Sequence, residues 1–397
     1  MNKYSLFLVS LMLFFFCCKQ KTQFDINLAV FEQEKIKKTE IIKFDNTEYI
    51  DSCQFIQLET TEKSLFGEIT QLETFEEKFY IYDRQTKKIK VFDHTGKFLN
   101  DIGKLGQGPG EYINISFFFL NPKEKKIGLY DPSKSAIHEY TLIGNFLRTV
   151  KLPNNQDLSC VRKSVFIDDF IFCYSCINDG ENYTYIILSS NNYLVVKTFC
   201  PYPVKPLNPM YAIVMNHPFS FVDGKFHYLS LFSDTIFAYV NEEAIPYLFV
   251  ETGKPNISST SLKERELDFV DNPLQTCVEV WRDDKYSPGF TELGETDRFI
   301  IIRYNFNNSF YFLDKMKNSG FHVENSFLPN LGTPSAIEGN KIIRIWNPFD
   351  ISTYKEFINN EKGELPKQLD DLLRDYDPDN DNPVLVVYYM KNNLDER

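Results

Sequence analysis

The sequence has no cluster of Lys and Arg of the kind that binds nucleic acid. Proteins that contact phosphate backbones use grouped positive charges to displace counterions. The formal net charge is −12, which also argues against such a partner. An acidic balance of this size favours solubility and says little about the fold. Nucleic acid is therefore excluded as an expected partner.

Motifs of familiar catalytic sites are also missing. The sequence contains no HExxH, no GxSxG and no recognisable nucleophile–base arrangement. Cys173 and Cys176 have the spacing of a redox or zinc pair, but no second pair follows and both lie in an apolar, strand-like run. We interpret them as buried strand cysteines. The even number of cysteines after Cys18 permits disulfides in an exported chain, but their connectivity cannot be deduced.

Long helix-forming stretches are few, whereas aromatic residues are abundant. Phe and Tyr number 37 and 23 in a chain of 397 residues. Together with many Ile and Val, they suit pleated, half-buried surfaces, and the composition favours an all-β fold. A chain of this length buries a core large enough to need no disulfide or metal, and single all-β domains often exceed the average domain length.

The first eighteen residues predict export and a lipid anchor. One Lys precedes an apolar run from Tyr4 to Phe16, which is too short to span a ~30 Å hydrocarbon core but has the length of a signal-peptide core. The run ends at Cys17 and Cys18, which resembles a bacterial lipoprotein signal. Since cleavage requires a small residue before the cut, Cys18 is the expected lipid-attachment site and Cys17 the second choice. Plain secretion and an uncleaved anchor are the alternatives.

A gapless repeat of 48 residues is the most informative pattern. Segments 80–99 and 128–147 share residue types at that offset, and each reads as strand, turn, strand, turn, strand. With a preceding strand, which covers Glu68–Leu72 in the first unit, each unit gives four antiparallel strands, which is typical of a propeller blade. The matching pairs are Tyr82/Tyr130, Asp83/Asp131, Ile89/Ile137, Phe92/Tyr140, Gly96/Gly144, Phe98/Phe146 and Leu99/Leu147.

More divergent copies of this unit predict a ring of six blades. A third unit starts at Phe170 and has Asn192 at the left-handed turn position, a fourth starts at Phe219, a fifth at Phe299 and a sixth at Lys341. Short helices are expected as insertions from Ser261 to about Phe269 and over Pro366–Tyr376.

The sixth unit has no outer strand of its own, and the sequence offers one from the other end of the chain. We expect Cys53–Glu59 to pair with the C-terminal strand Pro383–Met390, which closes the ring and hides two sheet edges. The predicted organisation is a signal peptide over 1–17, a tether over 18–45 and a six-bladed β-propeller of four-stranded antiparallel blades over 46–397.

Two polar segments are candidates for a binding site. The Gly-rich loop from Gly103 to Tyr112 is followed by an apolar strand and not by a helix, so it does not resemble a phosphate loop. We interpret it as a connector between blades on one rim. Its candidates for binding a partner are Gly103, Gln107, Gly108, Glu111 and Tyr112.

Metal-binding candidates are weak. Asp377, Asp379 and Asp381 alternate as in a calcium loop, but the Gly and the bidentate Glu of a full loop are absent. A polar turn is the preferred interpretation, with weak calcium binding as the alternative, and no other cofactor is expected. Of the histidines, His94 and His138 fall on outer parts of a blade. His217 precedes a predicted inner strand and is the best candidate for the mouth of the channel.

The chain resembles a family of bacterial lipoproteins described as six-bladed β-propellers and related to NHL-repeat propellers. The resemblance rests on Gln57–Thr60, Val91–Phe98, Gly103–Tyr112 and Asp381–Leu385. It implies a Bacteroides-type envelope protein and supports fold and location, because the function of this family is mostly unassigned.

These observations predict a lipid-anchored binding or scaffold protein of the cell envelope, at the outer membrane or on the periplasmic face. Its partner would be a carbohydrate, a peptide or a protein, engaged through one rim. The alternative is an NHL-like lyase or hydrolase with a metal in the central channel, since propellers host both kinds of function.

Overall fold

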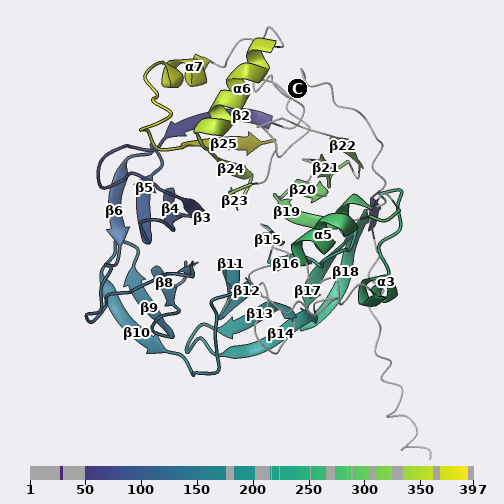
Figure 1. The fold of residues 1–397 in the computed structure, drawn as a ribbon, viewed down its shortest axis with the longest axis horizontal. Coiled ribbons are helices and arrows are strands. Elements are labelled where there is room, and N and C mark those ends of the chain that lie inside the picture. The colour runs from purple at the N-terminus through teal and green to yellow at the C-terminus, as the bar shows by residue number, and fades with distance from the viewer. Residues whose placement is uncertain are drawn as a thin grey trace, which may run out of the picture.

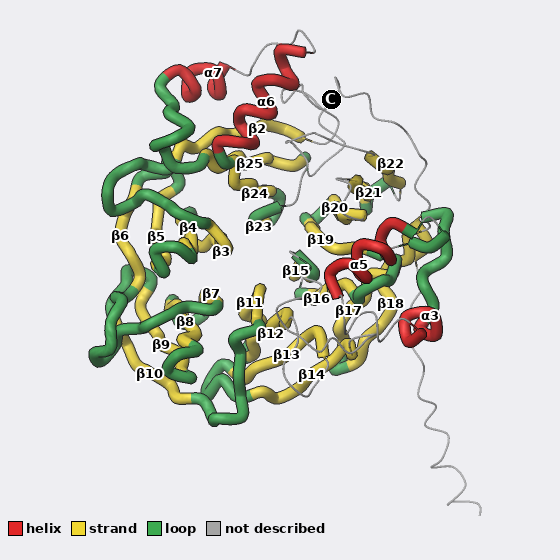
Figure 2. Tube along the Cα trace, in the orientation of Figure 1, coloured by secondary structure: helices red, strands yellow, loops and turns green. Residues whose placement is uncertain are grey.

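Six antiparallel sheets stand around a common axis and form a closed ring (Figure 1). This arrangement confirms the expected six-bladed β-propeller, and Figure 2 shows that strands make up most of the ring. The computed structural model describes residues 27–29, 50–175, 183–201, 215, 217–222, 224–250, 252–264, 273–283, 285–287, 289–304, 309–317, 319–323, 334–360 and 367–391. The predicted signal peptide, Cys17 and Cys18 lie outside these residues.

The first two blades contain the 48-residue repeat. Gly96 and Gly144 occupy the same hairpin position, with φ of 89° and 88°, a region that favours glycine. The repeated Asp83 accepts hydrogen bonds from the backbone of Gly67 and Glu68, and Asp131 accepts one from Ile113. Each carboxylate thus ties a second strand to the loop that enters its blade. Blade I contains β3 (Ile69–Phe75), β4 (Lys78–Asp83), β5 (Lys88–Asp93) and β6 (Phe98–Ile102), and blade II contains β7 (Phe117–Asn121), β8 (Lys126–Asp131), β9 (Ala136–Thr141) and β10 (Phe146–Lys151).

Blades III to V keep the same antiparallel order. At the hairpin between β13 and β14 of blade III, the left-handed residue is Tyr193, with φ of 61°, and not the expected Asn192. The Asn192 side chain instead accepts a hydrogen bond from the backbone of Leu194. The strands of these blades are β11 (Val161–Ile167), β12 (Phe170–Ser175), β13 (Tyr183–Ser189) and β14 (Val195–Pro201); β15 (Phe219–Val222), β16 (Lys225–Leu229), β17 (Thr235–Val240) and β18 (Glu243–Val250); and β19 (Phe290–Glu295), β20 (Phe299–Tyr304), β21 (Ser309–Asp314) and β22 (Ser319–Val323).

Blade VI is built from both ends of the chain. It contains β23 (Ala336–Glu338), β24 (Lys341–Trp346), β25 (Val384–Met390) and β2 (Ile50–Gln57). The register pairs Cys53 with Tyr388 and Gln57 with Val384, in antiparallel order. The predicted closure of the ring is confirmed.

The described part of the chain contains four helices outside the six sheets. The short helix α3 (Ser259–Glu264) begins earlier than expected, because the Ser258 hydroxyl accepts the backbone hydrogen bond of Ser261 and caps it. The predicted C-terminal helix is α7 (Lys367–Arg374), whereas α5 (Pro273–Arg282) and α6 (Pro348–Asn360) were not predicted. In Figure 1, α7 lies beyond the outer strand β2 of blade VI, whereas α6 overlaps β2 in this view and packs against Trp346 of β24.

Helix α6 begins with a reciprocal cap. The Asn347 side chain accepts the backbone hydrogen bond of Asp350, and the Asp350 carboxylate accepts that of Asn347. The helix then buries Ile351 and Tyr354 against Trp346 in the core of blade VI. Within the described residues, no helix combines the length and the apolar character needed to cross a bilayer.

Strand β1 (Asn27–Ala29) lies within the segment predicted as a tether. It pairs in parallel with β18, the outer strand of blade IV, and matches Asn27 with Leu248 and Ala29 with Val250. This blade therefore has five strands. The most N-terminal of the described residues therefore contact the outer edge of blade IV.

Candidate ligand-binding channel

Two cavities follow one another along the axis of the ring. Cavity 1, of about 360 Å³, is lined by residues of β3, β11, β15, β19 and β23, and cavity 2, of about 330 Å³, mainly by β3 and β11. Figure 1 shows that these strands are the innermost of their blades. Cavity 2 touches the starts of the inner strands, including Ile69 and Arg162, and cavity 1 touches later residues such as Thr74 and Val165.

Both cavities share a common middle, which we call the waist of the channel. Each has a volume in the range of pockets that bind small molecules. The waist combines two apolar side chains, a serine and three titratable groups. The residues that line both cavities are Leu72, Glu73, Lys163, His217, Pro334 and Ser335.

Lys163 and His217 are hydrogen-bonded to each other at the waist. The Lys163 Nζ lies 2.8 Å from the His217 Nδ1 and 5.1 Å from the centre of the Phe219 ring. Burial lowers the pKa of Lys163 to about 8, although the charges of Glu73 and Glu292 act in the opposite direction. Burial, followed by the Lys163 charge, lowers the pKa of His217 well below its usual value. The imidazole is therefore neutral and accepts a hydrogen bond from the lysine.

Glu73 is the acidic group at the waist. Burial raises the pKa of its carboxyl group, opposed by a hydrogen bond from Gln71 and by the charge of Lys163. The Gln71 amide donates that bond at 3.0 Å, and it also donates to the Phe118 carbonyl. Among the described residues, neither Glu73 nor Lys163 forms an ion pair.

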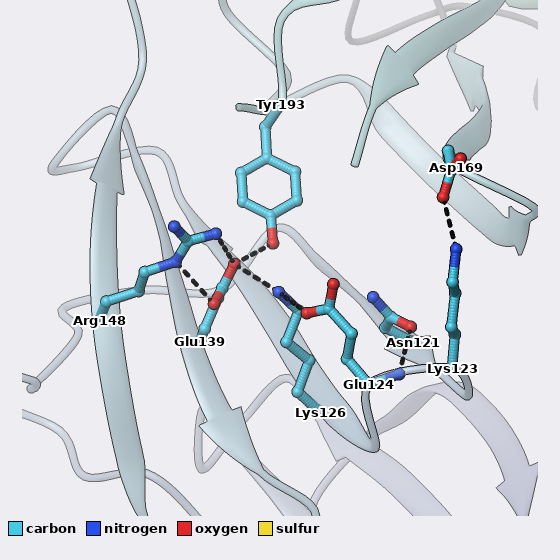
Figure 3. A network of polar contacts seen from close by, with 8 residues as sticks. All are labelled: Asn121, Lys123, Glu124, Lys126, Glu139, Arg148, Asp169 and Tyr193. Carbon is cyan, nitrogen blue, oxygen red and sulfur yellow. Dashed lines mark hydrogen bonds and ion pairs between the residues drawn. The ribbon is translucent and has the colours of Figure 1, made fainter. Parts of the chain in front are cut away.

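Several buried carboxylates of this protein have cationic partners in direct contact. Figure 3 shows Glu139 between Arg148 and Lys126, at 2.9 and 3.0 Å, with the Tyr193 hydroxyl also bonded to it. Arg298 pairs with Asp314, and Arg303 with Glu292 at 2.9 Å. The charges at the waist differ from these, because Glu73 and Lys163 influence each other's pKa but form no direct ion pair among the described residues.

The two ends of the channel carry opposite charges. Asp297 and Glu295 line only cavity 1, and Arg162 lines only cavity 2. Glu295 is already engaged, because it accepts hydrogen bonds from His227 and Ser220 and pairs with Lys315. Asp297 and Arg162 are exposed. The channel is therefore acidic toward the ends of the inner strands and basic toward their starts.

The predicted rim loop is a compact connector between β6 and β7. Glu111 accepts a hydrogen bond from the backbone of Gly108 at 2.9 Å and pairs with Lys104 at 3.0 Å. Tyr112 is fully buried between blades I and II, where it belongs to the core. Gly103, Gln107 and Gly108 are at least partly accessible. Binding of a partner by this loop stays a prediction, and Tyr112 contributes packing in this conformation.

The Asp377–Asp381 segment forms a turn that uses its own carboxylates. Asp381 accepts a hydrogen bond from the backbone of Asp377, and Asp377 accepts one from Asp379 and one from the Asn380 amide. In the part of the chain that the structure describes, no three His, Cys, Asp or Glu residues are grouped to hold a metal ion. Calcium binding by Asp377, Asp379 and Asp381 stays a prediction.

The structure places His217 in the channel, together with two residues that the sequence did not single out. Glu73 and Lys163 lie on β3 and β11, the innermost strands of blades I and III. A charged residue within an innermost strand is the sequence signal that could have identified these two channel residues. It was missed because β11 was not recognised, and the predicted first strand of blade I ended at Leu72.

Comparisons with known proteins agree with this architecture. A solved structure of a Bacteroides fragilis protein described as exported superposes with a TM-score of 0.70, at 16% identity, over 92% of this chain and 99% of that chain. A member of the DUF4221 family from Bacteroides vulgatus superposes with a TM-score of 0.50, at 10% identity, over 87% and 98% of the two chains. At these identities the likeness concerns the fold alone.

No curated protein matches the sequence of this chain. A family model does match it, and over most of its length. The model described as a domain of unknown function, DUF4934, covers residues 25–389, and the chain therefore belongs to that family.

Proposed function

We propose that this chain is an exported, lipid-anchored envelope protein that binds or scaffolds a carbohydrate, peptide or protein partner. A small polar part of that partner enters the central channel. The observation that carries the proposal is the waist, where Glu73 and Lys163 face two connected cavities and form no direct ion pair among the described residues. Buried charges are costly unless a partner compensates them, so a site of this kind gains most from a bound polar group.

Export and anchoring rest on the N-terminal sequence. The apolar run ending at Cys17 and Cys18 has the features of a lipoprotein signal. The structural likeness to a Bacteroides protein described as exported supports the same location. One acyl chain gives only marginal membrane binding, so stable attachment requires the multiple chains that a lipoprotein carries.

The anchor is tested by metabolic labelling with a radioactive fatty acid in a bacterial host that processes lipoproteins. We expect the full chain to incorporate label and to sediment with membranes. Cys18→Ser should lose both properties, whereas Cys17→Ser should keep both, since Cys17 would be removed with the signal peptide. Label that persists in Cys18→Ser and disappears in Cys17→Ser would move the attachment site to Cys17. An unlabelled full chain would rule out the anchor.

Ligand binding is tested by thermal unfolding of the purified chain with separate panels of saccharides, short peptides and divalent metal ions. A ligand at 100 times its Kd stabilises the folded state by about 2.7 kcal/mol, so a saccharide or peptide that binds should raise the Tm measurably. Metal analysis of the same preparation addresses the alternative. Stoichiometric calcium or zinc, with hydrolysis or lyase activity, would favour the NHL-like enzyme, and no shift with any saccharide or peptide would contradict the binding proposal.

A further inference from the structure

The charges of the channel are ordered along its axis. Lys163 lines the waist, and Arg162, the preceding residue of β11, lines only cavity 2. Glu73 at the waist and Asp297 beyond it are the acidic counterparts, with Asp297 on the side of cavity 1. A ligand lying along the axis meets both signs of charge within one connected space.

We propose that the channel binds a zwitterion of the peptide class, a free amino acid or a short peptide with both ends unblocked. This inference rests on the proposed binding function and names its ligand. The carboxylate lies toward Lys163 and Arg162, and the ammonium group lies toward Glu73 and Asp297.

Charge compensation is the physical reason for preferring a zwitterion. A ligand with one charge would satisfy one group at the waist and leave the other facing a space from which it has displaced water. An unpaired charge in such a site is strongly unfavourable. A neutral sugar would leave both charges uncompensated. A ligand with two opposite charges pairs both groups at once.

The neighbours of the two charges leave them available to a ligand. Lys163 donates one hydrogen bond to His217, and an ammonium group has three protons to donate. Glu73 accepts one hydrogen bond from Gln71, and a carboxylate can accept several. Apolar side chains, among them Leu72 and Phe219, complete the wall and suit small aliphatic side chains.

The test is isothermal titration of the full chain with L-alanyl-L-alanine, its N-acetyl form and its C-terminal amide. Hydrogen bonds to charged groups contribute more than neutral ones, so we expect each blocked form to bind about 10- to 100-fold more weakly than the free dipeptide. Lys163→Met and Glu73→Gln then identify the group that recognises each end. Glu73→Gln should bind the free and N-acetylated peptides equally, and Lys163→Met should bind the free and amidated peptides equally.

Matched controls are Glu76→Gln and Lys123→Met, because these residues pair with Lys125 and Asp169 at the surface. They should keep the full discrimination, and thermal unfolding checks that every variant is folded. Equal binding of free and blocked dipeptides, or discrimination that survives in both channel variants, overturns the zwitterion. If a neutral saccharide such as N-acetylglucosamine binds instead, the proposed function stands and this inference fails. If no saccharide or peptide binds, both fail.

Discussion

A chain that ends at Asn382, and so lacks β25, is expected to lose cooperative unfolding and to be recovered mainly as aggregate. The side chains of Val384, Leu385 and Val386 are fully buried, and those of Val387 and Tyr388 are at most 3% exposed. Burial of one such side chain stabilises a fold by about 1.5–3 kcal/mol. Five of them together reach the whole stability of a typical domain, which is about 5–15 kcal/mol.

The position of β25 makes the loss larger than that of an edge strand. Its Val386 and Tyr388 pack in the core facing blade V, and its Leu385 and Val387 pack in the core facing blade I. Its removal also deprives β2 and β24 of their partner. A chain that ends at Lys391 keeps β25 and is the matched control, with circular dichroism during heating as the measurement. A sharp transition in the shorter chain would show that the ring does not need its closure.

Glu139→Ala is expected to lower the free energy of unfolding by about 3 kcal/mol. Removing one member of a buried ion pair costs about 3–5 kcal/mol, because the remaining charge is left uncompensated. We place this change at the lower end, since Arg148 is 51% exposed and regains water, whereas Lys126 is 7% exposed and does not. Urea titration at pH 7 measures the loss.

Glu124→Ala is the control, because this residue pairs with the same Lys126 but is itself 55% exposed (Figure 3). It should cost less than about 1 kcal/mol. Equal losses in the two variants would mean that burial of Glu139 has no special role.

The difference in stability between the wild type and Glu139→Ala is also expected to depend on pH. Burial alone would raise the pKa of Glu139, but hydrogen bonds from Arg148, Tyr193 and Lys126 outweigh it and hold the pKa below the usual value. A carboxyl group with a lowered pKa in the folded state stabilises the fold above its unfolded pKa, and this contribution disappears as the pH falls through the folded pKa. The difference in stability between the wild type and Glu139→Ala should therefore shrink below about pH 4.5.

The sequence predicted those parts of the fold in which the residues that form the repeat also fix the local backbone structure. The turn glycines Gly96 and Gly144, and the repeated Asp83 and Asp131, each perform the same local task in two blades, so their spacing disclosed the repeat. The closing pair of strands could be predicted because β25 is apolar along its length and the sixth blade had no other outer strand.

The innermost strands β11 and β19 were not predictable in the same way. They border the channel, so charged residues such as Lys163 and Glu292 interrupt the apolar alternation that identifies a strand. The candidate site was not predicted from the sequence for the same reason. Glu73, Lys163 and His217 come from three distant parts of the chain, and only closure of the ring brings them to one waist.

The pairing of β1 with β18 has a consequence for the orientation of the molecule at a membrane. About nine residues separate Cys18 from Asn27, and at ~3.3–3.6 Å per residue they reach about 30 Å at most. If Cys18 carries the proposed lipid, the outer edge of blade IV is held near the bilayer surface. Blade IV would then be the part of the ring tethered closest to the membrane surface.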